Sequence, residues 1–359
     1  MIVVVPSCRQ VDPATFAPLV DAGARFIIVD DSEGRISSPH PSFRVVNWGD
    51  HARLLGDNAI AIPRRNGACR DLGFFLAWKE AEPGELVIAL DDDCKVEDAD
   101  FAGLIERRLT DGVHRAARGA GKFFNIFDLF ETPRDERLFP RGFPYSARLG
   151  YRRWSFDAEA RGTVAFNVGL WRGIFDINAI DKLALECTDF PEARLAHPSA
   201  VVPPGVLASA CSGSLQFRRE LIPAVYQLPM AVEVLSGARI DRYGDIWAGY
   251  ILKTLMDIRG DLMTVGGPLV HHQREGGSAA NAAREHLAHL VNEEFVALLA
   301  ECAAEVRAAG YLEMMRALHD GLRRRREKAS PILRAYLVHL DRCLSAWLAA
   351  LGSAEYAHA

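Results

Sequence analysis

The first hundred residues alternate short apolar runs with stretches in which apolar residues recur at helical spacing. Short apolar runs bounded by Gly, Pro and Asp are typical of strands buried on both faces of a sheet. The runs that predict strands are residues 1–6, 25–31, 43–48, 58–63 and 85–93. The stretches that predict helices are residues 12–23 and 69–81. Strands that alternate with helices in this way predict a parallel sheet.

The pattern changes after residue 120. The candidate strands there, of mixed direction, are residues 122–130, 162–171 and 205–217, and residues 245–260 have helical spacing. From residue 279 the chain is rich in Ala, Leu, Glu and Arg, which predicts helices. We therefore expect an α/β domain over residues 1–278, with a nucleotide-binding parallel half and a mixed second half, and a helical appendix over residues 279–359.

Three carboxylates, Asp91, Asp92 and Asp93, directly follow the apolar residues 87–90. Open α/β sheets bind ligands at the carboxyl ends of their strands. Adjacent negative charges repel one another unless a cation or hydrogen-bond donors offset them. Mg²⁺ and Mn²⁺ bind carboxylate and phosphate oxygens together, so this strand end could hold a nucleotide diphosphate through a metal ion. The alternative is an acidic turn that caps a helix predicted over residues 96–109.

Composition and charge narrow the function classes. The chain has 359 residues, a net charge of −5 and 49% hydrophobic residues. This charge gives no general attraction to nucleic acid or to an anionic membrane, so any nucleotide must be bound locally. The basic run 323–326 lies in the helical part, where a solvated helix face is the preferred interpretation.

The N-terminal apolar run meets Pro6, which makes it too short for a secretion signal, and no apolar run is long enough to span a membrane. A cytoplasmic protein is the expectation. Seven cysteines are widely spaced without a CxxC motif, which predicts reduced thiols and neither a disulfide framework nor a zinc site.

Several words of the sequence, in order along nearly the whole chain, resemble one family. They are Ala68-Cys69-Arg70, Asp91-Asp92-Asp93-Cys94, Phe123-Phe124-Asn125, Arg141-Gly142-Phe143-Pro144-Tyr145-Ser146-Ala147-Arg148, Gly169-Leu170-Trp171, Arg219-Glu220-Leu221 and Arg242-Tyr243-Gly244-Asp245-Ile246-Trp247-Ala248-Gly249. The chain resembles the reversibly glycosylated polypeptides, which act as UDP-arabinopyranose mutases. The resemblance implies a glycosyltransferase type A fold, with a Rossmann-like nucleotide-binding sheet, a mixed second half and here a C-terminal helical segment.

The resemblance also implies a metal-bridged UDP diphosphate. Asp91 and Asp93 would hold the metal, and Asp92 would face the sugar or the fold. His272 matches a family histidine that could complete the metal shell, which would favour Mn²⁺ over Mg²⁺. A buried structural histidine is the alternative. Arg70 could offset phosphate charge.

Asp30 and Asp31 end the second predicted strand. A carboxylate there suits hydrogen bonds from uracil or ribose, because it accepts from N–H and O–H groups. For Asp30 the alternative is a turn residue without a ligand.

Two arginines and one carboxylate are implied at the sugar. Arg141 matches the family residue that becomes reversibly glycosylated, and Arg148 matches a second arginine linked to activity. A protonated guanidinium has no lone pair to donate, so an arginine nucleophile needs a carboxylate nearby. The alternative makes both arginines clamps for the departing UDP. Asp245 would hold sugar hydroxyls or cap the helix predicted over residues 245–260.

The words nearest the nucleotide match the family more fully than those expected at the sugar. At the sugar end, Val168, Ser214 and Gly244 stand where the family has a histidine, an asparagine and a carboxylate.

Three functions follow as hypotheses. The first is a mutase that interconverts UDP-L-arabinopyranose and UDP-L-arabinofuranose, with a self-glycosylated arginine as one route. The second is a metal-dependent glycosyltransferase that passes the sugar of a UDP-sugar to a separate acceptor. The third is a non-catalytic nucleotide-binding scaffold whose helical appendix docks a partner. We expect a UDP-sugar substrate, no nucleic-acid partner, no membrane span and assembly as a homo-oligomer.

Overall fold

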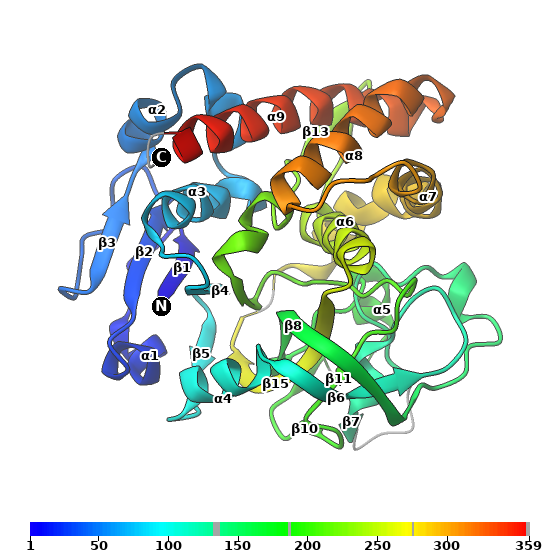
Figure 1. The fold of residues 1–359 in the computed structure, drawn as a ribbon, viewed down its shortest axis with the longest axis horizontal. Coiled ribbons are helices and arrows are strands. Elements are labelled where there is room, and N and C mark those ends of the chain that lie inside the picture. Colours follow the sequence, from blue (N-terminus) through cyan, green and yellow to red (C-terminus); the bar gives the residue numbers. More distant parts are fainter. Residues whose placement is uncertain (132–136, 186–187, 275, 357–359) are drawn as a thin grey trace.

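A computed structural model describes residues 1–131, 137–185, 188–274 and 276–356. Within these residues, eleven strands form one large sheet in the order β3-β2-β1-β4-β12-β8-β6-β11-β15-β5, with β9 paired to β8 (Figure 1). The strands are β1 (Ile2–Ser7), β2 (Arg25–Asp30), β3 (Phe43–Val46), β4 (Leu86–Leu90), β5 (Cys94–Val96), β6 (Asp111–Arg118), β7 (Phe130–Glu131), β8 (Ser155–Ile174), β9 (Asp189–Phe190), β10 (Arg194–Leu195), β11 (Ser199–Val201), β12 (Ser214–Arg218), β13 (Val232–Leu235), β14 (Ala238–Ile240) and β15 (Leu262–His272). The helices are α1 (Ala17–Asp21), α2 (Trp48–Leu55), α3 (Asp71–Glu80), α4 (Phe101–Arg108), α5 (Ala179–Ala184), α6 (Gly244–Arg259), α7 (Ser278–Ala303), α8 (Tyr311–Arg325) and α9 (Pro331–Tyr356).

The N-terminal half of the sheet is parallel, as the apolar pattern predicts. β1 pairs in parallel with both β2 and β4, and β2 pairs in parallel with β3. Helix α3 packs closely on β1, because a Cβ added at Gly73 would lie only 2.3 Å from Cγ1 of Val4. This close approach of helix and strand requires glycine at that position.

The second half of the sheet mixes directions. β12 runs antiparallel to both β4 and β8, and β6 runs antiparallel to β8, whereas β15 runs parallel to β8. The expected α/β class with a mixed second half is therefore confirmed, and it is consistent with a glycosyltransferase-like architecture.

The strand expected over residues 58–63 is wrong. Residues Gly56–Ala61 form a 3₁₀ helix that contacts α9. The phenol of Tyr226 donates to the Ala61 carbonyl, and the Cys343 thiol lies 3.5 Å from the Ile60 carbonyl oxygen. These carbonyls are bound by side chains and not by a neighbouring strand, so an apolar run that is buried by tertiary packing was mistaken for a strand.

Two other expected strands are only partly present. In residues 122–130, one bridge joins Phe123 to Leu207, and then Asn125 accepts from the Phe127 N–H at 3.2 Å and starts a 3₁₀ turn. Asparagine favours such turns because its side chain bonds the backbone two residues on. In residues 205–217, only the end belongs to a strand, and residues 211–213 form a loop beside the candidate site.

The helical prediction for the C-terminal part is confirmed over its described residues. Figure 1 shows α9, in red, running across the molecule above α3 towards α2. The Trp347 ring stacks on Tyr226 with 5.0 Å between centroids, and Trp78 Nε1 donates to the Leu351 carbonyl at 3.3 Å. The last helix is therefore packed against both the start and the middle of the chain. The domain boundary between residues 278 and 279 stays a prediction.

Among the described residues, no helix has the length and apolar character needed to cross a membrane. The arginines of the run 323–326 each pair with a carboxylate, such as Glu305 with Arg325 and Asp341 with Arg323. This is the arrangement of a solvated helix face.

The six described cysteines are free thiols, and of these only Cys8 is exposed. Cys187 lies outside the described residues.

Candidate active site

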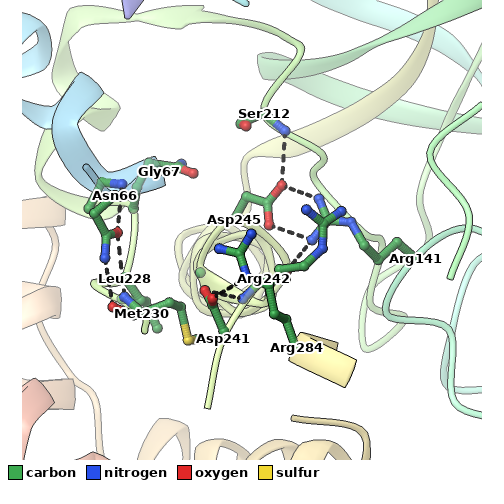
Figure 2. A pocket seen from close by; sticks show the side chains of 13 residues that line it. Asn66, Gly67, Arg141, Ser212, Leu228, Met230, Asp241, Arg242, Asp245 and Arg284 are labelled. Atoms are coloured by element: carbon green, nitrogen blue, oxygen red, sulfur yellow. Dashed lines mark hydrogen bonds and ion pairs between the residues drawn. The ribbon is translucent and has the colours of Figure 1, made fainter. Parts of the chain in front are cut away.

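Two adjoining cavities lie at the carboxyl end of β4. The larger, of about 420 Å³, is lined by Asp91, Asp93 and His272 among others. The smaller, of about 190 Å³, is lined by residues 66–68 and by the start of α6 (Figure 2). The residues that line both cavities are Arg141, Ser212, Arg242, Asp245 and Arg284. The two spaces therefore form one continuous candidate site.

The three consecutive carboxylates point in different directions. Asp91 lines the larger cavity and accepts from the buried guanidinium of Arg70, whose Nη1 also donates to the Ser212 carbonyl at 3.0 Å. Asp92 accepts from Ser7 and Arg9 and lines neither cavity. Asp92 therefore ties the end of β4 to the end of β1. The expected phosphate partner Arg70 is placed behind Asp91 and not in the cavity itself.

Asp93 directly precedes β5 and His272 ends β15, and these two strands are paired. The Nδ1–H of His272 donates to the Ile174 carbonyl at 2.7 Å, which leaves the Nε2 lone pair available. Nε2 lies 3.9 Å from Oδ1 of Asp93. Burial, and then the negative charge of Asp91, raise the pKa of Asp93. A cation at this position would relieve that repulsion.

These donors fit a divalent metal. Asp91, Asp93 and His272 line the same cavity, and a backbone carbonyl that orients an imidazole is a common feature of metal-binding histidines. In the described part of the chain, no three His, Cys, Asp or Glu side chains are already gathered around one metal position. A metal would therefore need further oxygen ligands, such as those of a diphosphate. The metal stays a prediction.

Arg141 is clamped between two carboxylates. Its Nε and Nη2 donate to Asp176 at 2.9 Å, and its Nη1 and Nη2 donate to Asp245 at 3.0 and 2.6 Å. Nη1 also donates to the Arg242 carbonyl. A guanidinium has five N–H donors, so all five are used. Figure 2 shows Asp245 between this guanidinium and the backbone N–H of Ser212, from which it accepts at 3.3 Å.

The clamp fixes the charge of its members. Burial opposes the positive charge of Arg141, but the charges of Asp176 and Asp245 outweigh this effect and raise the pKa of Arg141 well above its ordinary value. Burial would likewise raise the pKa of Asp176, yet the charge and hydrogen bonds of Arg141 hold it well below its usual range. Glycosylation of an arginine requires at least one carboxylate beside the guanidinium. Here two carboxylates lie beside it.

Arg148 is not brought together with the other predicted residues. It makes two bonds to Asp181 of α5, at 2.9 and 2.7 Å, and lines neither cavity. Its guanidinium carbon lies 4.2 Å from the centroid of the Tyr145 ring and 4.7 Å from that of Phe139. In this position Arg148 joins α5 to the segment that carries Phe139 and Tyr145.

Asp30 and Asp31 also lie outside the two cavities. Asp30 is buried and accepts from both the N–H and the hydroxyl of Ser32, which is the turn role considered as the alternative. Asp31 accepts from Trp48 Nε1 at 3.1 Å and from the Arg65 N–H at 3.0 Å, and burial raises its pKa. A uracil or ribose role for either residue stays a prediction.

The charged residues that line the cavities but were not predicted as site residues are Asp176, Lys182, Asp241, Arg242, Arg274 and Arg284. Glu285, also not predicted, lines neither cavity but pairs with Arg242. Asp176 comes two residues after β8, so the strand-end rule that selected Asp91 could have found it. Arg242 has a left-handed backbone with φ of 64°, which is uncommon for any residue except glycine. Arg284 and Glu285 lie on α7, where no local signal separates them from other helix residues.

Comparison with known proteins agrees with this architecture. The family model described as reversibly glycosylated polypeptide matches residues 16–352. UDP-arabinopyranose mutase 1 of Arabidopsis thaliana is 28% identical over 92% of this chain and 86% of its own length. UDP-arabinopyranose mutase 3 of the same plant is 27% identical over 98% and 92%, and UDP-arabinopyranose mutase 1 of Oryza sativa is 25% identical over 97% and 89%. Because the family model covers nearly the whole chain, the protein belongs to the reversibly glycosylated polypeptide family.

Proposed function

We propose that the protein is a UDP-sugar mutase that converts UDP-L-arabinopyranose into UDP-L-arabinofuranose. The observation that carries the proposal is the match of nearly the whole chain to relatives named UDP-arabinopyranose mutase. The cavity agrees with it, because it combines a carboxylate and histidine edge suited to a metal diphosphate with the buried Arg141 clamp.

In this proposal the ring oxygen of the sugar changes from O5 to O4, and the C1–O bond to UDP is broken and remade. No atom is gained or lost, but the hydroxyl proton must move from O4 to O5. Asp245 lines both cavities and is held by Arg141 and Ser212, which supports a role for its carboxylate in taking the proton from O4 and giving it to O5.

Asp91, Asp93 and His272 would hold the divalent metal, with Mn²⁺ preferred because one ligand is an imidazole. When bound, the metal would supply positive charge to the diphosphate as UDP departs.

The route through a glycosylated Arg141 has a definite requirement. For Nη of Arg141 to attack C1 while UDP leaves, the guanidinium must give a proton to Asp176 or Asp245 and release one of its hydrogen bonds. The raised pKa of Arg141 opposes that transfer. In the other route Arg141 stays a cation and fixes the two carboxylates.

The first experiment incubates the purified protein with Mn²⁺ and a panel of UDP-sugars that includes UDP-L-arabinopyranose. We expect an isomerised UDP-sugar, detected by chromatography, without any acceptor. Intact-protein mass, with Arg141→Lys as the control, separates the routes, since only the covalent route adds a pentose-sized increment. Release of free UDP without an isomer would replace the mutase with a glycosyltransferase. No turnover with UDP bound would support the scaffold.

A second experiment tests the metal. The double variant Asp91→Asn/Asp93→Asn should lose Mn²⁺ binding, measured by electron paramagnetic resonance with UDP present. The double variant Asp98→Asn/Asp100→Asn is the matched control, because these two carboxylates have the same spacing but are exposed and outside the cavities. Unchanged Mn²⁺ binding in the first variant would disprove the metal site. A cytoplasmic location and a homo-oligomer stay predictions from the sequence.

A further inference from the structure

Two adjacent residues before α6 pair reciprocally with two adjacent residues of α7. Arg242 Nε donates to Glu285 Oε1 at 2.9 Å, and Arg284 Nε donates to Asp241 Oδ2 at 2.7 Å. Each segment therefore contributes one arginine and one carboxylate. These two ion pairs connect the first turns of α7 to the segment before α6 that lines the candidate site.

Both arginines are held only through Nε. Among the described residues, no hydrogen bond is found for Nη1 or Nη2 of either Arg242 or Arg284. Both side chains line the two cavities at once. In Figure 2 they lie near the start of α6, beside the Arg141 clamp.

The hydrogen bonds of Arg141 differ from those of Arg242 and Arg284. All five N–H donors of Arg141 are bound to protein acceptors, so it cannot bind an anion without releasing one of them. In Arg242 and Arg284, both Nη1 and Nη2 are available to donate hydrogen bonds to a ligand. The Nη1 and Nη2 edge of a guanidinium matches two phosphate oxygens in a bidentate contact.

We propose that Arg242 and Arg284 bind the diphosphate of a UDP-sugar at the junction of the two cavities, and that Glu285 and Asp241 are the positioning residues that orient them. The inference rests on the proposed function for its ligand, a nucleoside diphosphate. It gives the C-terminal helices a part in the site, because Arg284 and Glu285 belong to α7.

Glu285 has the features of a positioning residue. It has 0% exposure, and its second oxygen accepts from the Ala179 N–H at 2.8 Å. Burial would raise its pKa, but the neighbouring His289, whose Nε2 lies 3.6 Å from Oε2, and the charges of Arg141 and Arg242 bring it below its ordinary value. Glu285 is therefore charged and fixed from two sides, and a fixed carboxylate restricts the rotation of the Arg242 guanidinium.

The test is calorimetric titration with UDP and with uridine, in the presence of Mn²⁺, for Arg242→Gln and Arg284→Gln. Each variant should bind UDP about tenfold more weakly, equivalent to about 1.4 kcal/mol, with uridine affinity unchanged. The matched control is Arg323→Gln, because Arg323 also donates through Nε to an aspartate at 2.9 Å but lies far along the chain in α8 and outside both cavities. Wild-type affinity for UDP in both variants, or an equal loss for uridine, would overturn the proposal.

The positioning role of Glu285 needs a measurement that general destabilisation of the fold would not change. Glu285→Gln should weaken UDP binding but not uridine binding, and the double variant with Arg242→Gln should lose no more UDP affinity than Arg242→Gln alone. Additive losses would show that Glu285 does not act through Arg242. The mutase proposal fails separately: a wild type that binds UDP through these arginines but isomerises no UDP-sugar would refute the activity and leave the binding site standing.

Discussion

Removal of the Arg141 side chain should be among the most destabilising single changes in this protein. Arg141→Ala deletes five hydrogen bonds and leaves Asp176 and Asp245 without their cation. The side chains of these carboxylates are only 19% and 12% exposed. Breaking a buried ion pair by removing one partner costs about 3–5 kcal/mol. We expect a loss in the free energy of unfolding in this range at pH 7.

The loss should depend on pH in a defined direction. In the wild type the pKa of Asp176 is depressed, so this group stabilises the fold above its unfolded value of about 3.9 and the contribution is lost as pH falls below it. In the variant, burial without Arg141 raises the pKa of Asp176, so protonation relieves the unpaired charge. The difference between wild type and variant should therefore shrink between pH 7 and pH 4.

Urea unfolding at pH 7.0 and pH 4.5, followed by tryptophan fluorescence and circular dichroism, measures this difference. Arg53→Ala is the control, because Arg53 pairs with Asp50 at 2.6 Å but is 73% exposed, and such a pair contributes less than about 1 kcal/mol. A loss for Arg141→Ala no larger than that of the control, or one that does not change with pH, would refute the reasoning about the clamp.

Three further predictions concern the fold and the thiols. Gly142→Ala should destabilise the protein by at least about 2 kcal/mol in thermal unfolding, because φ is +89° and a Cβ would lie 2.4 Å from Cγ2 of Ile246. Gly150→Ala is the control and should cost less, because Gly150 has φ of +71° but open space around it. Equal losses in the two variants would contradict this prediction. Trp347→Ala should cost about 3–5 kcal/mol in urea unfolding, because the ring is fully buried, and a loss below 1 kcal/mol would be inconsistent with that packing. Cys8→Ser should remove one rapidly reacting thiol from a native Ellman titration, since Cys8 is exposed. An unchanged count of rapid thiols would contradict this.

The sequence was most informative where local pattern and tertiary packing agree. Residues 85–93 are apolar and then acidic, and they form β4 with Asp91 at its end, because a central parallel strand leaves little choice of conformation. Residues 58–63 are similarly apolar but became a 3₁₀ helix, because α9, far away in the sequence, covers them. No local window contains that information.

The same distinction applies to the site. The resemblance selected Arg141 and Asp245, which are 104 residues apart in the chain and meet in the structure. It also selected Arg148, which the structure places outside the cavities, on Asp181. The pairing of Arg242 with Glu285 depends on how α7 packs, and a buried carboxylate in an otherwise ordinary helix has no signature of its own.

The packing of α9 has a consequence for the synthesis of this protein. Trp347 stacks on Tyr226, and Trp78 donates to the Leu351 carbonyl, so aromatic side chains from the middle and the start of the chain contact the last helix. A ribosome-bound or prematurely terminated chain that ends before Pro331 would therefore leave both aromatic side chains without these contacts. Such exposed apolar surface is what chaperones and proteases recognise, so an incomplete copy would be a target for cellular quality control.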